Sequence, residues 1–491
     1  MDTTSARTLG ELRQTEWASQ IDRPYSVRDE MRRNLVAMLE NGEEPFPGIV
    51  GFHDTVLPQI ENAILSKHHF ILLGLRGQAK SRILRALTGL LDEKMPIVAG
   101  SEINDHPFHP ISKPAKQLIE EMGDDTPIDW VDRDQRYVEK LATPDVTIAD
   151  MIGDVDPIKA AKGGHLLSDE LTMHYGLLPR SNRGIFAINE LPDLAGKIQV
   201  GLFNILQEGD IQIKGYPIRM PLDVLMVFSA NPEDYTARGK IITPLKDRIG
   251  SEILTHYPSS IEDGVSITKQ EAWIDRESTA IDVPQFICEL VEQVAFQARE
   301  DKRVDHRSGV SQRLPISLLE AVISNAERRS ILVKEKTIVP RVSDVYAALP
   351  TITGKIELEY EGELQGSEKI AREIVKRATA ATFDSHVDVN LCAAIIDWFE
   401  QGGALKMAPE ERSDICLKGL GVIPDLFSTV DISGLAPKKD PATMVSASEL
   451  ILDGLVAKKR ISLNESRGYV RAQPKPQMPP PFGHHDDLSF G

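Results

Sequence analysis

Three short apolar runs in the chain stop abruptly at polar residues. The runs cover residues 70–73, 185–188 and 222–230, and they are followed by GLRGQAKS, by Asn189 and Glu190, and by Asn231. Apolar runs of this length without polar alternation predict strands of a parallel sheet that is buried on both faces. Because ligands of such sheets bind at the carboxyl ends of the strands, these polar residues mark a candidate site.

Helical periodicity surrounds the strands and takes over after about residue 257. Apolar residues recur three and four positions apart within residues 28–40, 54–65, 287–295, 318–323 and 370–378. This spacing places them on one face of an amphipathic helix. Strands alternating with helices and then helices alone predict an α/β protein, a doubly wound αβα sandwich with a helical lid and an additional helical C-terminal unit.

Turn residues and composition divide the chain into five expected parts. They are an N-terminal helical arm in residues 1–44, the αβα domain in 45–256, the helical lid in 257–385, a helical C-terminal unit in 386–470 and a disordered tail in 471–491. The tail is proline-rich, and such tracts do not form a packed core.

Weaker patterns give secondary expectations. Residues 96–99 and 137–141 are expected to be strands, residues 101–136 an irregular surface insertion, residues 201–208 a helix, residues 211–219 a hairpin, and residues 355–363 a short strand or linker.

Composition limits the class of protein. Apolar residues make up 41% and charged residues 26% of the 491 positions, as in a soluble protein of several domains. The net charge of −18 argues against broad binding to nucleic-acid backbones. Three widely separated cysteines give no zinc spacing and fit a reducing compartment. Neither a signal peptide nor a membrane span is visible, so a cytoplasmic protein is expected.

The turn after the first strand has the composition of a loop that binds phosphate. In GxxxxGK[ST] loops, backbone N–H groups and the lysine hold the phosphates of ATP, while the Ser or Thr hydroxyl holds Mg²⁺. The corresponding residues are Gly74, Leu75, Arg76, Gly77, Gln78, Ala79, Lys80, Ser81 and Arg82, with Ala79 at the place of the last glycine. The alternative is an ordinary strand–turn–helix with a surface lysine.

The other strand ends supply groups suited to hydrolysis. Glu190 could polarise the attacking water, and Asn189 stands where an aspartate normally orients the metal, so a neutral oxygen replaces a charge. Asn231 could orient water or the terminal phosphate, although Asn-Pro is also common turn chemistry. Arg248, in PLKDRIG, could face a neighbouring subunit's phosphate, and Arg313 opens a later helix.

Together these stretches resemble the AAA+ ATPases, and among them the magnesium chelatase ATPase-subunit group. PFPGIVGF is similar to the family's segment before the phosphate loop, and GLLPRSNRGIFAINELPDL to the stretch around its second Walker motif. Residues 211–234, ending in FSANPED, resemble its pre-sensor hairpin and sensor 1, PLKDRIG its arginine-finger segment, and residues 311–313 the start of its sensor 2 helix. The likeness runs in order through residues 45–329.

The resemblance implies a role for each candidate residue. Residues 74–81 would bind the phosphates, Glu190 would activate water, Asn231 would sense the terminal phosphate, Arg248 would act on the neighbouring subunit's ATP, and Arg313 would contact nucleotide from the lid. Such proteins form homo-oligomeric rings, usually hexamers, and remodel a protein partner, often one with a von Willebrand A domain. The DxSxS motif of that domain is absent here, so such a partner would be a separate chain.

Two alternatives stay open. Ala79 and Asn189 depart from the family pattern, which favours a nucleotide-gated scaffold that binds ATP with little hydrolysis. A DNA-acting AAA+ protein, either a helicase or a transcription activator, is the other, because helicases share the hairpin before sensor 1. The net charge of −18 and the absent GAFTGA loop argue against it. The chain also extends beyond the chelatase subunit, so porphyrin metallation is not implied.

Overall fold

The chain forms two compact units. The computed structural model describes residues 6–163, 169–212, 219–232, 240–276, 280–408, 410–464 and 466–472. The first unit comprises residues 1–260 and 307–311, and the second comprises residues 261–306 and 312–491. The chain therefore returns briefly to the first unit between two helices of the second.

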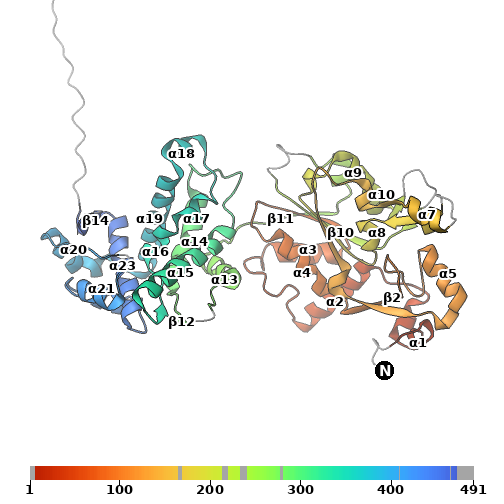
Figure 1. The fold of residues 1–491 in the computed structure, drawn as a ribbon, viewed down its shortest axis with the longest axis horizontal. Coiled ribbons are helices and arrows are strands. Elements are labelled where there is room, and N and C mark those ends of the chain that lie inside the picture. The colour runs from red at the N-terminus through yellow and green to blue at the C-terminus, as the bar shows by residue number, and fades with distance from the viewer. Residues whose placement is uncertain are drawn as a thin grey trace, which may run out of the picture. The chain divides into compact units, whose positions relative to one another are not determined.

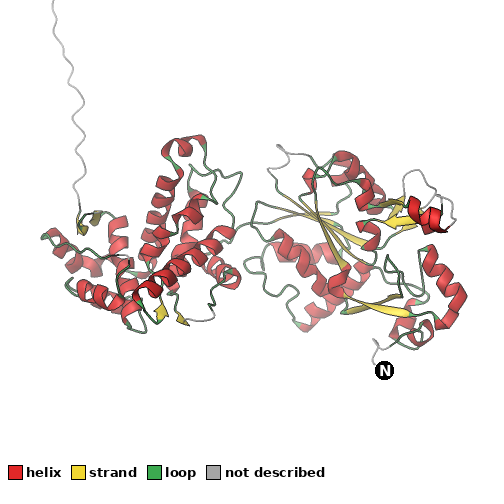
Figure 2. Cartoon of the chain, viewed as in Figure 1, coloured by secondary structure: helices red, strands yellow, loops and turns green. Residues whose placement is uncertain are grey.

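Within the described residues, the core of the first unit is a parallel sheet of five strands (Figures 1 and 2). In spatial order they are β11 (Ser251–Leu254), β1 (Phe70–Leu73), β10 (Val224–Ala230), β7 (Gly184–Asn189) and β4 (Tyr137–Leu141). The register pairs Leu73 with Ala230, and Phe228 with Ile188. The carboxyl ends of β1, β10 and β7 therefore lie next to one another, and the predicted strands that form them are confirmed.

Helices cover both faces of this sheet. Phe70 and Leu72 of β1 pack in an apolar cluster with α2 (Val27–Asn41), α3 (Val56–Leu65) and α4 (Lys80–Ala86). Ile71 and Leu73 pack on the other side with α8 (Leu177–Arg180), α9 (Gly196–Gly201) and α10 (Phe203–Gln207). Because successive residues of a strand point to opposite faces, both faces are apolar, and the expected αβα sandwich is confirmed.

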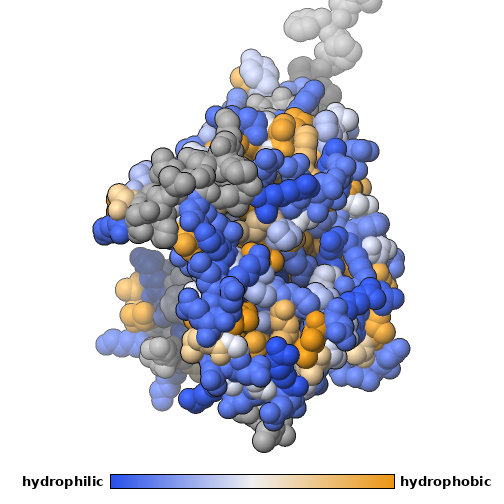
Figure 3. Space-filling view, turned by 90° about the vertical axis from the view of Figure 1, so that its right-hand side faces the viewer, coloured by the Kyte–Doolittle hydropathy of each residue, from blue (hydrophilic) through white to orange (hydrophobic). Residues whose placement is uncertain are grey.

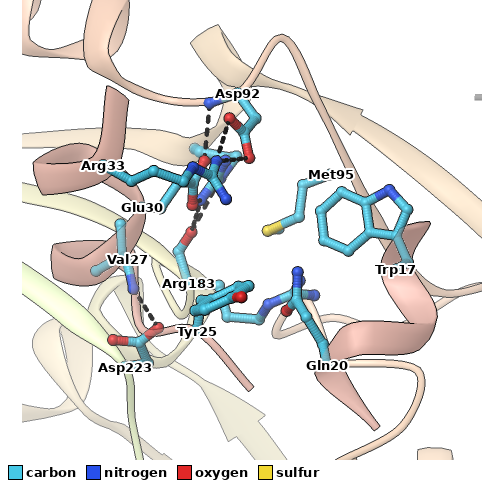
Figure 4. Close-up of a pocket in the computed structure, with 11 residues that line it drawn as sticks. Trp17, Gln20, Tyr25, Val27, Glu30, Arg33, Asp92, Met95, Arg183 and Asp223 are labelled. Carbon is cyan, nitrogen blue, oxygen red and sulfur yellow. Dashed lines mark hydrogen bonds and ion pairs between the residues drawn. The ribbon is translucent and has the colours of Figure 1, made fainter. Parts of the chain in front are cut away.

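The N-terminal segment, expected to be an arm, belongs to the core of the first unit. Met31 and Leu35 of α2 are fully buried in the same cluster as Phe70. Figure 4 shows a polar contact at the start of α2, where the Val27 N–H donates a hydrogen bond of 2.7 Å to Asp223. The apolar face of α2 is thus buried against neighbouring helices and the sheet.

A buried ion pair reinforces this attachment. The guanidinium of Arg136, which is 1% exposed, binds both carboxylate oxygens of Glu30 of α2 at 2.6 Å. Arg136 also donates to the carbonyl of Arg183 at 2.9 and 2.7 Å. Burial lowers the pKa of Arg183 to about 9 and raises the pKa of Asp223 to about 6. Charged groups therefore lie inside this end of the unit, opposite the carboxyl ends of the strands.

Residues 101–136 contain regular structure, so the prediction of an irregular insertion was wrong. Helix α5 (Lys113–Met122) begins after Ser112, whose side chain accepts a hydrogen bond from the Ala115 N–H, and a proline lies in its first turn. Strand β3 (Ile128–Asp132) pairs antiparallel with β2 (Lys94–Val98). The strand predicted near residues 96–99 is present but lies outside the main sheet.

Short elements complete the first unit. They are α1 (Leu9–Leu12), α6 (Ile148–Met151), β5 (Gly153–Val155), α7 (Pro157–Gly163), β6 (Met173–Tyr175), β8 (Asp210–Gln212), β9 (Arg219–Pro221) and α12 (Thr243–Lys246). Strands β8 and β9 pair antiparallel, which confirms the predicted hairpin, while its tip at residues 213–218 lies outside the described residues. The helix predicted for residues 201–208 corresponds to the end of α9 and to α10.

The second unit is mainly helical. Its helices are α13 (Ile261–Glu271), α14 (Gln285–Glu300), α15 (Arg313–Val333), α16 (Val342–Ala347), α17 (Leu349–Thr353), α18 (Tyr360–Gln365), α19 (Ser367–His386), α20 (Ala393–Glu400), α21 (Ser413–Leu420), α22 (Leu426–Ile432) and α23 (Pro441–Ala457). Two small strand pairs join them, β12 (Ala280–Ile281) with β13 (Thr337–Ile338), and β14 (Ile461–Asn464) with β15 (Gly468–Arg471).

The expected lid and C-terminal unit pack against each other within this second unit. A Cβ placed on Gly454 of α23 would lie 2.3 Å from the ring of Phe383 of α19, so the two helices are in close contact. Residues 355–363 are not a strand or linker throughout, because α18 begins at Tyr360. The expected tail begins in strand β15, and residues 473–491 lie outside the described residues.

Polar residues dominate the face shown in Figure 3, with apolar side chains interspersed among them. In the part of the chain that the structure describes, no helix combines the length and apolar character needed to cross a bilayer.

Candidate nucleotide site

The loop after β1 fits its surroundings because residue 74 is glycine. The Gly74 N–H donates to the carbonyl of Ala230 of β10 at 3.1 Å, which ties the loop to the neighbouring strand. A Cβ on Gly74 would lie 1.9 Å from Thr255 Oγ1 and 2.2 Å from Gln78 Oε1. These two side chains are hydrogen-bonded to each other at 2.8 Å, so the loop closes tightly on the end of β1.

Two further loop residues have left-handed backbone conformations. Gly77 has a φ of +74°, which costs glycine little, whereas Ala79 has a φ of +56° and a ψ of +12°. For alanine this conformation costs about 1–2 kcal/mol. Position 79 is where the phosphate-loop pattern has its last glycine. The left-handed conformation explains why the pattern has glycine at this position. It also shows that the backbone of Ala79 is strained.

Lys80 begins α4, and its ammonium group lies against the loop. The residue is 8% exposed, and Nζ donates to the carbonyls of Gly74 and Leu75, the latter at 2.9 Å. Ser81 follows in the first turn of α4, and Arg82 is exposed. A lysine ammonium surrounded by loop backbone is the arrangement that holds the phosphates of a nucleotide.

Two residues far along the chain, Tyr257 and Gly309, form hydrogen bonds with Arg76 of the phosphate loop. The Tyr257 hydroxyl donates to the Arg76 carbonyl at 3.0 Å, and Arg76 Nε donates to the Gly309 carbonyl at 3.4 Å. Gly309 has a φ of +68°, and a Cβ there would lie 2.5 Å from the Tyr257 hydroxyl. The return of the chain at residues 307–311 therefore completes the rim of the loop, a contact that the sequence pattern did not predict.

Asn189 and Glu190 stand at the end of β7. Asn189 is 8% exposed, and its Oδ1 accepts a hydrogen bond of 2.8 Å from Ser229 Oγ. Glu190 has left the strand conformation, with a φ of +54°, and its N–H donates to the same hydroxyl at 3.4 Å. Ser229 of β10 thus links both residues to the neighbouring strand.

Asn231 follows the last residue of β10, directly after the carbonyl that anchors Gly74. The structure therefore brings together the phosphate loop, the Asn189–Glu190 pair and Asn231 at adjacent carboxyl ends of the sheet. These were the three groups that the sequence predicted to converge.

The two predicted arginines have other surroundings. Arg248 donates to the Gln207 side chain at 3.1 and 2.9 Å and to the Pro244 carbonyl at 2.7 Å, and it stacks 4.8 Å from the centre of the Phe203 ring. It is thereby held against α10 of its own chain. Arg313 is the exposed first residue of α15 in the second unit.

Curated proteins include clear relatives of this chain. Magnesium-chelatase subunit ChlI of Guillardia theta is 30% identical over 258 residues, which cover 68% of that protein and 51% of this chain. The chain belongs to the magnesium-chelatase-like family of AAA+ ATPases. The magnesium-chelatase 38 kDa subunit of Rhodobacter capsulatus is 29% identical over 245 residues, which cover 63% of that protein and 48% of this chain. About half of this chelatase-like ATPase therefore lies outside the matched stretch.

No family model matches the chain. A chain from the complex between subunits BchI and BchD of magnesium chelatase is 22% identical, and the similarity covers 65% of this chain and 98% of that chain with a TM-score of 0.35.

The donor groups of the chelatase-like ATPase suit Mg²⁺ that arrives with a nucleotide. Among the described residues, no group of three or more His, Cys, Asp or Glu side chains could hold a metal ion. The site instead offers the Ser81 hydroxyl, the Asn189 amide and the Glu190 carboxylate. Mg²⁺ prefers oxygen ligands and usually combines one or two protein groups with phosphate oxygens and water, so these residues fit it.

Sequence reasoning missed Glu139 of β4. The Asn189 amide donates to Glu139 Oε1, and Arg85 of α4 donates to the same carboxylate at 2.8 and 3.2 Å. Burial, followed by the Glu139 carboxylate, raises the pKa of Tyr137 above its ordinary value. The available signal was a carboxylate in the predicted strand at residues 137–141, but only strand pairing shows that it lies beside Asn189.

Proposed function

We propose that this chelatase-like ATPase binds MgATP at the carboxyl edge of its sheet and uses hydrolysis to remodel or activate a separate protein partner. The observation that carries the proposal is the convergence of the Lys80 loop, Glu190 and Asn231 on adjacent strand ends. Phosphate binding, water activation and sensing of the terminal phosphate need groups placed in this way.

Each residue then has a defined task. The backbone of residues 74–81 and the Lys80 ammonium hold the phosphates, and Ser81 and Asn189 hold Mg²⁺. Glu190 accepts a proton from the attacking water, while Asn231 orients the water or the terminal phosphate. When bound, Mg²⁺ neutralises charge on the phosphate oxygens.

The proposal extends to a ring, in which a neighbouring subunit would supply an arginine to the terminal phosphate of ATP. We assign this role to Arg248 of a neighbouring subunit in a homo-oligomeric ring, usually a hexamer in such proteins. Arg313 would contact the nucleotide from the helical second unit. The partner would be a separate chain that carries a von Willebrand A domain.

Steady-state phosphate release with Mg²⁺ and ATP tests the proposal. Wild-type protein should release phosphate with a rate per subunit that rises with protein concentration, because sites are completed by assembly. Lys80→Ala should lose ATP binding, whereas Glu190→Gln should keep it and lose release by at least about 100-fold. Release that is unchanged in both variants would refute the proposal.

The strained Ala79 and the neutral Asn189 support a second candidate, a nucleotide-gated scaffold that binds ATP with little hydrolysis. The two candidates differ in one experiment. Tight ATP binding by the wild type without phosphate release at any protein concentration favours the scaffold, and robust release that Glu190→Gln abolishes removes it.

A further inference from the structure

Asn189 poses a chemical problem at the proposed site. Mg²⁺ is held best by charged carboxylate oxygens, and an amide offers only a neutral oxygen. Asn189 is 8% exposed, so a charged side chain that acts through its amide has to be in direct contact with it.

Glu139 is in such contact. Asn189 Nδ2 donates to Glu139 Oε1, and Asn189 Oδ1 accepts from Ser229 Oγ at 2.8 Å. An ionised carboxylate only accepts hydrogen bonds, so this network fixes which way the amide points. The amide of Asn189 therefore connects the Glu139 carboxylate to the polar end of β10.

The placement of Glu139 follows from the sheet register and from α4. Glu139 lies opposite Ala187, two residues before the pair of Leu141 and Asn189, so its side chain is on the same face as that of Asn189. Arg85 binds both Glu139 oxygens, and Arg85 lies four residues after Ser81 on the same side of α4. The carboxylate thus bridges the helix that carries Ser81 and the strand that carries Asn189.

We propose that Glu139 supplies the negative charge that Asn189 lacks, so that the two side chains together position the Mg²⁺ of MgATP. The inference rests on the proposed nucleotide site. A carboxylate that accepts from an amide N–H polarises the amide and strengthens its carbonyl oxygen as an acceptor. Groups of this kind behind a metal ligand typically contribute 10- to 100-fold in metal affinity. Glu139 is a positioning residue that acts through Asn189.

A Mg²⁺ titration of nucleotide binding tests this without relying on turnover. The probe is a fluorescent, non-hydrolysable ATP analogue, titrated with Mg²⁺. Glu139→Gln should raise the Mg²⁺ concentration at half-saturation by about 10- to 100-fold. Binding of the analogue in EDTA should stay unchanged, because the loop and Lys80 are intact.

Asp92→Asn is the matched control. Asp92 forms a comparable ion pair with Arg33, 2.7 Å to each oxygen, within the same unit. Its loss removes one carboxylate and one ion pair away from Asn189, so the Mg²⁺ midpoint should not move. A shift equal to that of Glu139→Gln would show a general charge effect and overturn the inference.

A charge transposition separates positioning from a structural role. The double variant Asn189→Asp with Glu139→Gln returns a carboxylate to β7 and should restore the midpoint to within a few-fold of wild type. An unchanged midpoint in Glu139→Gln, or a loss that the double variant fails to restore, would overturn the inference while wild-type binding upheld the proposed site. Wild-type protein that binds no analogue at any Mg²⁺ concentration would overturn both.

Discussion

At the scale of single residues, the phosphate loop contains an alanine in a backbone conformation that is unfavourable for alanine. Ala79 adopts the left-handed region at the turn into α4, and Gln78 and Thr255 close over Gly74. Contacts with neighbouring residues therefore hold the loop in this conformation, and packing elsewhere offsets the free-energy cost of the strain at Ala79.

Ala79→Gly should relieve this cost. In the left-handed region glycine avoids the penalty of about 1–2 kcal/mol that alanine has. Glycine also makes the unfolded chain more flexible, which offsets part of this gain. The variant should therefore be more stable than the wild type by up to about 1 kcal/mol. Ala86→Gly is the control, because Ala86 packs against the same cluster but has a right-handed helical conformation, where glycine costs up to about 1 kcal/mol. Thermal unfolding of both variants measures the difference; equal destabilisation would contradict the strain at Ala79.

At the residue scale, the sequence was enough to predict the groups that come shortly after a buried strand. Lys80, Glu190 and Asn231 follow apolar runs, and local pattern suffices to find them. Glu139 and Gly309 could not be found in this way, because their roles depend on strand register and on a return of the chain over a long sequence separation.

At the scale of elements, β1 is fixed at both ends by polar contacts. At its start His69 is 6% exposed, its Nδ1 accepts from the Met226 N–H at 3.0 Å, and its carbonyl accepts from the Gly250 N–H at 2.9 Å. Burial, with a contribution from the charge of Arg28, lowers the pKa of His69 to about 4. The strand that leads into the phosphate loop therefore requires a neutral histidine.

This histidine should make the first unit sensitive to acid. Its pKa is lower in the folded state, so unfolding takes up a proton between about pH 6.5 and pH 4, and the stabilisation present above that window is lost as pH falls through it. Between about pH 7 and pH 5 the expected loss is about 2 kcal/mol.

His69→Asn keeps an acceptor near the position of Nδ1 and removes the titrating group. Hydrogen exchange of β1 and β10 peptides at both pH values should show a smaller loss of protection in this variant than in the parent. His106, whose pKa burial lowers to about 2, and Asp223 titrate in both proteins, so their effects cancel in the comparison. Equal pH dependence in the two proteins would exclude His69 as a source.

Prediction of elements succeeded where apolar runs and periodicity were long. Strands β1, β7 and β10 and the long helices α14, α15 and α19 were predicted from local pattern. Strand β2 was predicted without its partner β3, because local sequence does not show which strands pair in the folded protein. Helix α2 was assigned to an arm because the sequence does not show what packs against its apolar face.

At the scale of the whole molecule, the proposed ring makes a prediction about mixtures of inactive variants. Lys80→Ala subunits would not bind nucleotide but would still supply Arg248 to a neighbouring site. Arg248→Ala subunits would bind nucleotide but would supply no arginine to the neighbouring site. Mixed in equal amounts, they should regain about a quarter of wild-type phosphate release if they assemble at random.

The control for this mixing experiment pairs Lys80→Ala with Glu190→Gln. Both residues belong to the site of one chain, so this mixture should stay inactive. Recovery in the control as well, or no recovery in the test mixture, would contradict a site shared through Arg248.

The return of the chain at residues 307–311 also limits how the molecule can be divided. A gene fragment that ends after residue 260 encodes the sheet and the phosphate loop, but it omits the Gly309 carbonyl to which Arg76 donates. Neither unit is one continuous stretch of coding sequence. The helical unit could therefore not be exchanged as a cassette by recombination at a single junction, because the segment that braces the loop would be carried away with it.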